Sequence, residues 1–313
     1  MADYGPIKIR QASLDELNKL YQETYKKVAQ ELVDSAGAKR IQKARVMARI
    51  NYELSKLGVD GDKILKEELS KYYYDGANQA LQDLRDLDVN LSPSASAAIN
   101  KEAVAALVDE AVTLYGQGIA GISRNASNII STALRQNLNL TIAQGKITGS
   151  ARKMISAAVE KEIRDRGIGS LTDKAGRSWS LDSYTEMLVR TKGVEARNQG
   201  LANKMVSYGF DLVQVSNHGT QHKACRAWEG KILSLTGQTP TGAKLLGGYS
   251  VAGTVDEAKA AGLFHPNCKH AINVFTPRLA AATKAYDNPY LKMSDAERAQ
   301  SDLAFIRRSS DTL

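Results

Sequence analysis

The stretch SLDELNKLYQETYKKVAQEL, residues Ser13–Leu32, decides the fold class of this chain. Ser13 and Glu16 have the spacing of a capping box, in which each side chain satisfies a free backbone amide at the start of a helix. Apolar residues then recur at spacings of three and four, which places them on one helical face. They are Leu14, Leu17, Leu20, Tyr21, Tyr25, Val28 and Leu32. The sequence therefore predicts an amphipathic helix that packs against other helices.

The same helical pattern continues through the first half of the chain, with glycines as expected interruptions. One helix is expected between Gly37 and Gly58, and another from Gly61 to about Leu87. Residues 96–145 predict two helices that meet at a bend around Gly116, Gly118 and Gly121, because glycine disfavours helix by about 1 kcal/mol against alanine. A loop is expected at residues 90–94 and a further helix at residues 150–166.

After Gly167 the sequence pattern changes from helical to a mixture of helix and strand. Residues 173–179 predict a turn or hairpin, and a second capping box, Ser183 with Glu186, predicts a helix that ends at Gly209. Three short strands are expected from apolar alternation. They are residues 212–216, 231–235 and 271–275, with a Gly-rich stretch and a short helix, 255–262, between the last two.

The predicted fold class is mainly α with a small C-terminal α+β module. We expect an elongated helical body at residues 1–169, followed at 170–276 by a module in which short strands surround a Cys/His cluster. Residues 277–313 form a polar tail with one predicted helix at 295–307. No apolar run approaches the roughly 18 residues of a membrane helix, and the N-terminus has no signal-peptide pattern. We therefore expect a soluble protein that folds in a cytoplasm, with no membrane contact during assembly.

Positive charge is concentrated in one part of the chain. The formal net charge is +8, and residues 135–204 hold thirteen Lys or Arg against seven Asp or Glu. This bias suits non-specific binding of double-stranded DNA through Arg152, Lys153, Arg164 and Arg166, an acidic protein partner, or a plain solvated face. No interleaved aromatic residues favour base stacking.

All four histidines and both cysteines lie between residues 218 and 270. His222 and Cys225 are three residues apart, within one helical turn, and Cys268 and His270 share one side of an extended segment. We predict that His222, Cys225, Cys268 and His270 bind one structural zinc ion, with His265 as the alternative fourth ligand. His218 is interpreted as a neighbouring turn residue.

Three other interpretations of this cluster stay open. Cys225 and Cys268 can be small buried residues of a metal-free, hydrogen-bonded core, or the two halves of a disulfide. A cysteine and a histidine can also form a nucleophile with its base. No acidic residue has a spacing that singles it out as the third member of such a site, so we expect no enzyme.

Several segments of this region resemble the phage minor capsid (Mu F-like head morphogenesis) family over about residues 170–276. They are Arg190-Thr191, Glu195–Gly200, Asp211–Ser216, His218-Gly219, Cys225–Lys231 and Gly262–His270. Many members have a cysteine at the position of His222, which gives Cys-x-x-Cys, and zinc accepts either residue.

The resemblance implies a low-copy protein inside the phage head, bound to the portal protein and the major capsid protein. Such a protein assists head assembly and genome packaging or ejection. It is made in the host cytoplasm and ends in the virion, in the capsid interior. The alternative from another class is a DNA-binding or nuclease-like or toxin-like module built on the Cys/His cluster.

Overall fold

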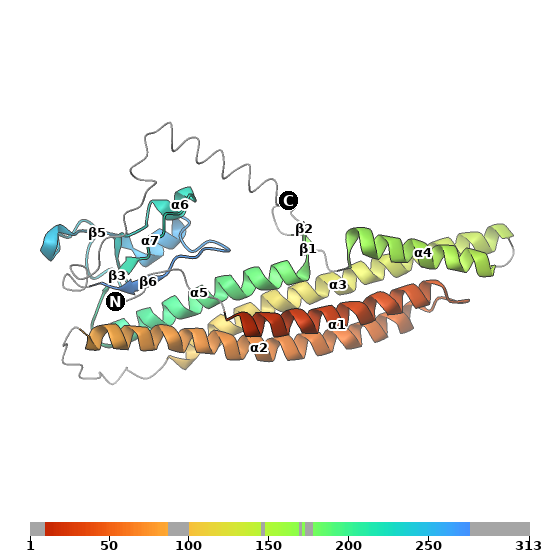
Figure 1. Ribbon diagram of the computed structural model, residues 1–313, viewed down its shortest axis with the longest axis horizontal. Helices are drawn as coiled ribbons and strands as arrows, with labels where there is room; N and C mark the ends of the chain where they lie inside the picture. The colour runs from red at the N-terminus through yellow and green to blue at the C-terminus, as the bar shows by residue number, and fades with distance from the viewer. Residues whose placement is uncertain (1–9, 87–99, 145–147, 169–170, 173–177, 276–313) are drawn as a thin grey trace, which may run out of the picture. The chain divides into compact units, whose positions relative to one another are not determined.

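The computed structural model describes residues 10–86, 100–144, 148–168, 171–172 and 178–275 (Figure 1). Its α-helices are α1 (Gln11–Ala36), α2 (Lys43–Arg85), α3 (Lys101–Gln144), α4 (Gly149–Arg166), α5 (Leu181–Ser207), α6 (Lys223–Arg226) and α7 (Val255–Ala260). Its strands are β1 (Leu171–Thr172), β2 (Ser178–Trp179), β3 (Leu212–Val215), β4 (Ile232–Ser234), β5 (Val251–Thr254) and β6 (Ile272–Val274). The predicted class, mainly α with a small C-terminal α+β module, is confirmed.

The chain divides into two compact units, each assembled from segments distant in sequence. The helical unit comprises the described residues of Arg10–Glu68 and Val108–Val189, and the mixed unit comprises the described residues of Leu69–Leu107 and Arg190–Leu313. The division predicted from sequence cuts the chain into consecutive segments, with boundaries at residues 169 and 276. It stays a prediction. The expected loop at 90–94 and the expected helix at 295–307 lie outside the described residues.

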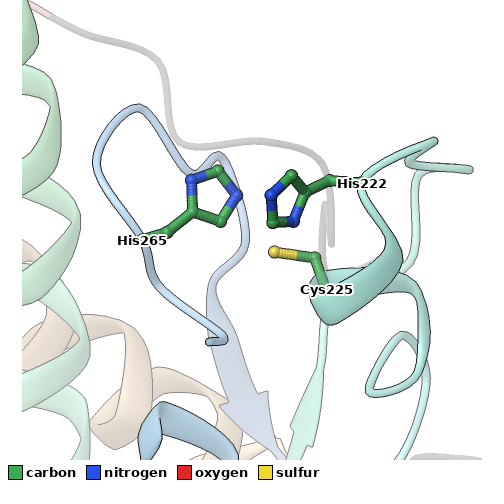
Figure 2. A group of neighbouring side chains, drawn as sticks. All are labelled: His222, Cys225 and His265. Atoms are coloured by element: carbon green, nitrogen blue, oxygen red, sulfur yellow. The ribbon is translucent and has the colours of Figure 1, made fainter. Parts of the chain in front are cut away.

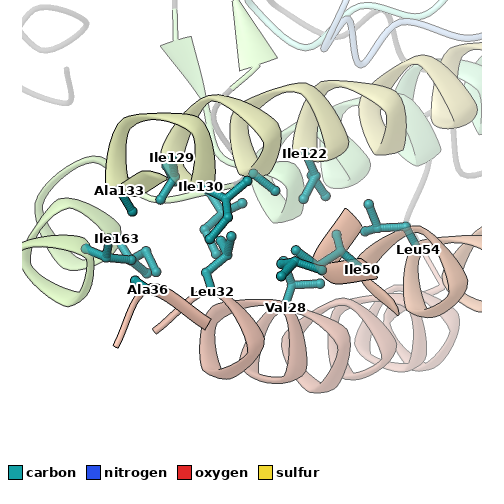
Figure 3. Close-up of a cluster of buried hydrophobic side chains, with 14 of the residues drawn as sticks. Val28, Leu32, Ala36, Ile50, Leu54, Ile122, Ile129, Ile130, Ala133 and Ile163 are labelled. Atoms are coloured by element: carbon teal, nitrogen blue, oxygen red, sulfur yellow. The ribbon is translucent and has the colours of Figure 1, made fainter. Parts of the chain in front are cut away.

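The core of the helical unit is built from one apolar stripe on each of α1, α2, α3 and α4 (Figure 3). Val28 and Leu32 of α1 belong to the predicted stripe and are buried beside Ile50 of α2 and Ile130 of α3. The predicted start of α1 was wrong, because Ser13 lies inside the helix. The N-cap position is Arg10, whose side chain makes no capping hydrogen bond.

Two predicted helix breaks are absent from the structure. α2 continues through Gly58 and Gly61, and α3 continues through the three glycines at 116, 118 and 121, so the predictions of separate helices were wrong. The reason at Gly61 is packing: a Cβ atom there would overlap the ring of Tyr115, which is fully buried. Burial of a large aromatic side chain outweighs a helix penalty of about 1 kcal/mol per glycine.

The connection into the mixed unit follows the prediction more closely. α4 lies where a helix was expected, and β1 pairs with β2 in antiparallel orientation. Of the turn or hairpin expected at residues 173–179, residues 173–177 lie outside the described residues. The capping box at Ser183 was wrong, because α5 begins two residues earlier. There the hydroxyl of Ser180 accepts a hydrogen bond from the backbone N–H of Ser183.

The mixed unit contains a four-stranded sheet in the order β5-β4-β3-β6. β3 is antiparallel to β4 and to β6, and β5 is parallel to β4. Three strands and α7 were predicted, but β5 was missed because its sequence, Val-Ala-Gly-Thr, has one large apolar residue and a glycine. The four-residue helix α6 was also not expected.

α5 supports this sheet and packs closely on the C-terminal part of α2. A Cβ atom at Gly200 would overlap the backbone of Tyr73, and one at Gly76 would overlap the carbonyl of Arg197. On the edge strand β6, the Asn198 side chain accepts a hydrogen bond from the N–H of Ile272. The Arg197 guanidinium donates to the carbonyl of the same residue. These contacts satisfy backbone groups that an edge strand would otherwise leave without partners.

The close packing of α2 and α5 at Gly76 and Gly200 predicts that alanine lowers stability more at Gly200 than at Gly116, another helical glycine. Gly200→Ala forces α2 and α5 apart and should lower the free energy of unfolding by about 1–3 kcal/mol, the cost of overpacking. Gly116→Ala in α3 meets no atom within 4 Å and should be neutral or stabilising. Thermal unfolding of both variants measures the difference. Equal melting temperatures would contradict the close packing of these helices.

Candidate metal centre

Two short segments of the mixed unit carry the Cys/His cluster. His222 and Cys225 lie at the start and inside of α6, and the loop between α7 and β6 carries His265, Cys268 and His270. The loop is tightly folded: Asn267 has a left-handed backbone with φ of 65°, and the N–H of Cys268 donates to the carbonyl of His265. Asparagine tolerates this conformation better than most residues.

α5 anchors the same loop. The backbone N–H of Asn267 donates to the hydroxyl of Thr191 over 3.1 Å. Together with the contacts of Arg197 and Asn198 to β6, this bond fixes both the loop and the strand that follows it. The segments Arg190-Thr191 and Glu195–Gly200, quoted above for the family resemblance, therefore position the candidate site.

The two thiols are buried and close together. The Sγ atoms of Cys225 and Cys268 are 3.6 Å apart, and both cysteines are free. Two thiolates on one tetrahedral zinc ion, each at about 2.3 Å from the metal, lie about 3.8 Å from each other. The observed separation therefore suits two ligands of one ion.

His270 joins the thiols to a buried carboxylate. Its Nδ1 lies 3.2 Å from Sγ of Cys268, and its Nε2 lies 3.0 Å from Oε1 of Glu229. The side chains of His270 and Glu229 are each only 2% exposed. The same Glu229 oxygen accepts the backbone N–H groups of His218 and Thr220. Three donors thus fix this carboxylate, which in turn fixes the direction of the His270 ring.

The pKa values of Glu229, His270 and Cys268 depend on one another, because these groups are linked by hydrogen bonds. Burial lowers the pKa of His270, but its hydrogen bonds with Cys268 and Glu229 outweigh burial and raise the pKa to about 9. Burial also opposes ionisation of Glu229, yet the hydrogen bonds from His270, Thr220 and His218 lower its pKa. The hydrogen bond between the thiols, assisted by His270, lowers the pKa of Cys268 and raises that of Cys225. Cys268 is therefore poised as a thiolate, the form that binds metal.

A pair of histidines lies on the more exposed side of the thiols. The rings of His222 and His265 are 4.0 Å apart between centroids, and Figure 2 shows both beside the sulfur of Cys225. Ligand atoms of these three residues all lie within 4.8 Å of one another, as do those of Cys225, Cys268 and His270. The two groups share Cys225.

The structure thus places His/Cys groups where they can bind a metal ion, and it brings all five predicted ligand residues together. Which four of them bind an ion stays a prediction. The donor set, two thiols with imidazoles, has the softness that zinc accepts and that magnesium or calcium does not. A groove of about 480 Å³ between α5 and α7 reaches His265 and Cys268 and offers an entry path.

Comparison with known proteins covers both units of the chain. The family model described as phage minor capsid protein 2 matches residues 19–304. The chain belongs to the phage minor capsid protein 2 family. The match extends well beyond the resemblance at residues 170–276 and includes the helical unit. No curated protein and no solved structure matches the chain significantly.

The predicted DNA-binding residues of this minor capsid protein all lie on α4. Lys153 is exposed and Arg152 is half-buried, while Arg164 lies 4.0 Å from Glu160 in an ion pair. The side chain of Arg166 is outside the described residues. No described helix has an apolar stretch long enough to cross a membrane.

Sequence reasoning missed Glu229. It lies inside the segment Cys225–Lys231 that carries the family resemblance, but its spacing to the histidines gave no reason to select it. His218, interpreted from sequence as a neighbouring turn residue, stacks on His270 with ring centroids 4.2 Å apart. Glu229 therefore completes a hydrogen-bonded series with Cys268 and His270. The spacing of the residues in the sequence did not reveal this acidic member.

Removal of the Glu229 charge should loosen the whole cluster. Glu229→Gln keeps the size of the side chain but weakens three hydrogen bonds in a buried place, which should cost about 1–3 kcal/mol of unfolding free energy. Glu16→Gln, at an exposed position of α1, is the matched control and should be neutral. Chemical denaturation of both variants measures the effect. Equal stabilities would mean that Glu229 does not organise the site.

Proposed function

We propose that this minor capsid protein is an internal component of the phage head, bound to the portal protein and the major capsid protein. There it assists head assembly and genome packaging or ejection, and it is not an enzyme. The observation that carries the proposal is the family match over residues 19–304, which includes the helical unit as well as the Cys/His cluster. The helical unit offers long helices as docking surfaces, and the mixed unit offers a small module that contains the Cys/His cluster.

One observation favours the rival function, a nuclease-like or toxin-like module. Cys268, His270 and Glu229 are aligned like a nucleophile, its base and an orienting carboxylate. Two other observations favour a structural role. Cys268 is only 3% exposed, and its Sγ atom lies 3.6 Å from the Sγ atom of Cys225. A nucleophile has to reach a substrate, whereas a structural ligand does not.

We further propose a structural zinc ion in the Cys/His cluster, held by Cys225, Cys268 and two of the three histidines His222, His265 and His270. Bound zinc would cross-link α6 to the loop before β6. The sheet of the mixed unit has strands of only three or four residues. A small module of this kind gains stability from a metal that ties distant segments together.

The zinc proposal predicts about one zinc per chain in protein purified without chelator. Cys268→Ser should lower the zinc content and the melting temperature, and chelation of the unmodified protein should lower its melting temperature similarly. Glu16→Gln, at an exposed position of α1 outside the Cys/His cluster, is the control that should keep the metal and the melting temperature. Elemental analysis and thermal unfolding test this together. Zinc well below one per chain would exclude the metal and leave the hydrogen-bonded core.

Association with head proteins is the central prediction of the proposed function. The chain should co-purify with the portal protein or the major capsid protein of its own phage when the proteins are co-expressed. It should also be found in few copies per particle in purified virions by mass spectrometry. Failure to bind either protein at moderate salt, together with absence from virions, would exclude this role.

We also propose weak, non-specific binding of double-stranded DNA by α4. Reversing the charge of Arg152, Lys153, Arg164 and Arg166 together should flatten the dependence of binding on salt, because each phosphate contact releases counterions. Reversal of Lys39 and Arg40, exposed residues that precede α2, is the control. Titration with duplex DNA at several salt concentrations measures the slope. An unchanged slope would assign these charges to a protein surface or to solvent.

A further inference from the structure

Cys225 and Cys268 are the two cysteines of the chain, so each thiol has one partner for an intramolecular disulfide. Both thiols are free in the structure, and their Sγ atoms are 3.6 Å apart. Two bonded sulfur atoms are about 2.0 Å apart, so a disulfide requires the thiols to approach each other further. The pair is therefore reduced but already in position for this bond.

Hydrogen bonds hold the backbone on both sides of the pair. The carbonyl of Cys225 accepts the N–H groups of Trp228 and Glu229, which anchors this cysteine in α6. The N–H of Cys268 donates to the carbonyl of His265 in the loop before β6. None of these bonds uses a sulfur atom, so they persist when the side chains rotate. Rotation of the two side chains can then shorten the separation from 3.6 Å to about 2.0 Å.

Cys268 is the thiol that a small molecule can reach. It is 3% exposed and lines the groove between α5 and α7, whereas Cys225 is fully buried and is not among the lining residues. The groove has a volume of about 480 Å³, many times the roughly 30 Å³ that a water molecule occupies in the liquid. Hydrogen peroxide is little larger than water and can enter this groove, whereas the polymeric substrate of a nuclease cannot.

We propose that hydrogen peroxide converts Cys225 and Cys268 into a reversible intramolecular disulfide, and that this bond replaces the zinc ion. The release of metal rests on the proposed zinc site. The formation of the disulfide rests on the positions of the two thiols alone. Cys268 is oxidised first, because it lines the groove, and Cys225 completes the bond.

The reaction has two steps and yields two molecules of water. The sulfur of Cys268 attacks one peroxide oxygen, so that an S–O bond forms, the O–O bond breaks and the first water leaves. The sulfur of Cys225 then attacks the sulfur of Cys268, so that the S–S bond forms, the S–O bond breaks and the second water leaves. Two electrons pass from the thiols to the peroxide. The thiol protons end in the water, and solvent supplies them where zinc has displaced them.

The zinc ion and the disulfide join the same two segments of the mixed unit. Each links α6 to the loop before β6, but they exclude each other, because zinc binds thiolates and a disulfide has none. A phage protein is made inside a cell, where thiols stay reduced, and later leaves the cell in the particle, where disulfides persist. The disulfide therefore preserves the cross-link under conditions that remove the thiolates.

The test uses the full chain, purified with its metal and treated with a small excess of hydrogen peroxide. About one zinc per chain should be released to a colorimetric chelator while both thiols disappear, and the intact mass should fall by two hydrogen atoms. Dithiothreitol and zinc together should reverse the change. The oxidised chain should melt at least about 5 °C above the reduced chain without metal, because the disulfide restricts the unfolded chain.

Cys225→Ser and Cys268→Ser are a matched pair of variants, because each removes one sulfur ligand. In Cys225→Ser, peroxide should oxidise Cys268 to a sulfenic acid that dimedone traps, since no second thiol displaces the oxygen. In Cys268→Ser, the buried Cys225 should react at least about tenfold more slowly. Circular dichroism checks that both variants keep their helix content, and the unmodified chain decides the question if either variant unfolds.

The outcomes separate this inference from the zinc proposal. If the chain holds zinc and peroxide leaves both thiols free, the inference is wrong and the zinc proposal stands. The same holds if Cys268 becomes a sulfinic acid while Cys225 stays free, or if the disulfide joins two chains. If the purified chain holds no zinc but forms the intramolecular disulfide, the zinc proposal and the release of metal fall, and the disulfide stands.

Discussion

The buried hydrogen bond between Glu229 and His270 is the interaction on which the mixed unit depends. It joins the segment after α6 to the loop before β6, and neither side chain reaches solvent. Because the same carboxylate binds two backbone amides, it also fixes the turn at residues 218–220. With both segments held, the thiols of Cys225 and Cys268 lie together. The arrangement is that of a histidine ligand oriented by a carboxylate, which is common around structural and catalytic metals.

α5 gives this centre a rigid base. Its Thr191, Arg197 and Asn198 side chains hold the site loop and the edge strand β6, and Gly200 lets the helix approach α2 closely. Every one of these residues lies in a segment that resembles the phage minor capsid family. The segments that carry the resemblance therefore support the Cys/His cluster, which gives the resemblance a structural explanation.

Periodicity and ligand chemistry were enough to predict much of this protein. The stripe from Leu14 to Leu32 predicted α1, and the clustering of His and Cys predicted a centre that the fold does assemble. The breaks expected at Gly58, Gly61 and Gly116 failed, and at Gly61 the reason is close packing on Tyr115, a partner distant in sequence about which local propensity carries no information. β5 forms because it pairs with β4, and Glu229 belongs to the site because it contacts His270, which is 41 residues away in the sequence. Such long-range contacts leave no periodic signal.

We propose that the Cys/His cluster is a closed structural metal centre in a head protein. X-ray absorption at the zinc edge of the purified full chain tests it most directly, because it reports the metal and its ligands together. A closed zinc site requires two sulfur ligands at about 2.3 Å and two nitrogen ligands at about 2.0–2.1 Å, with no water ligand. Absence of zinc, or a spectrum without zinc–sulfur scattering, would contradict it.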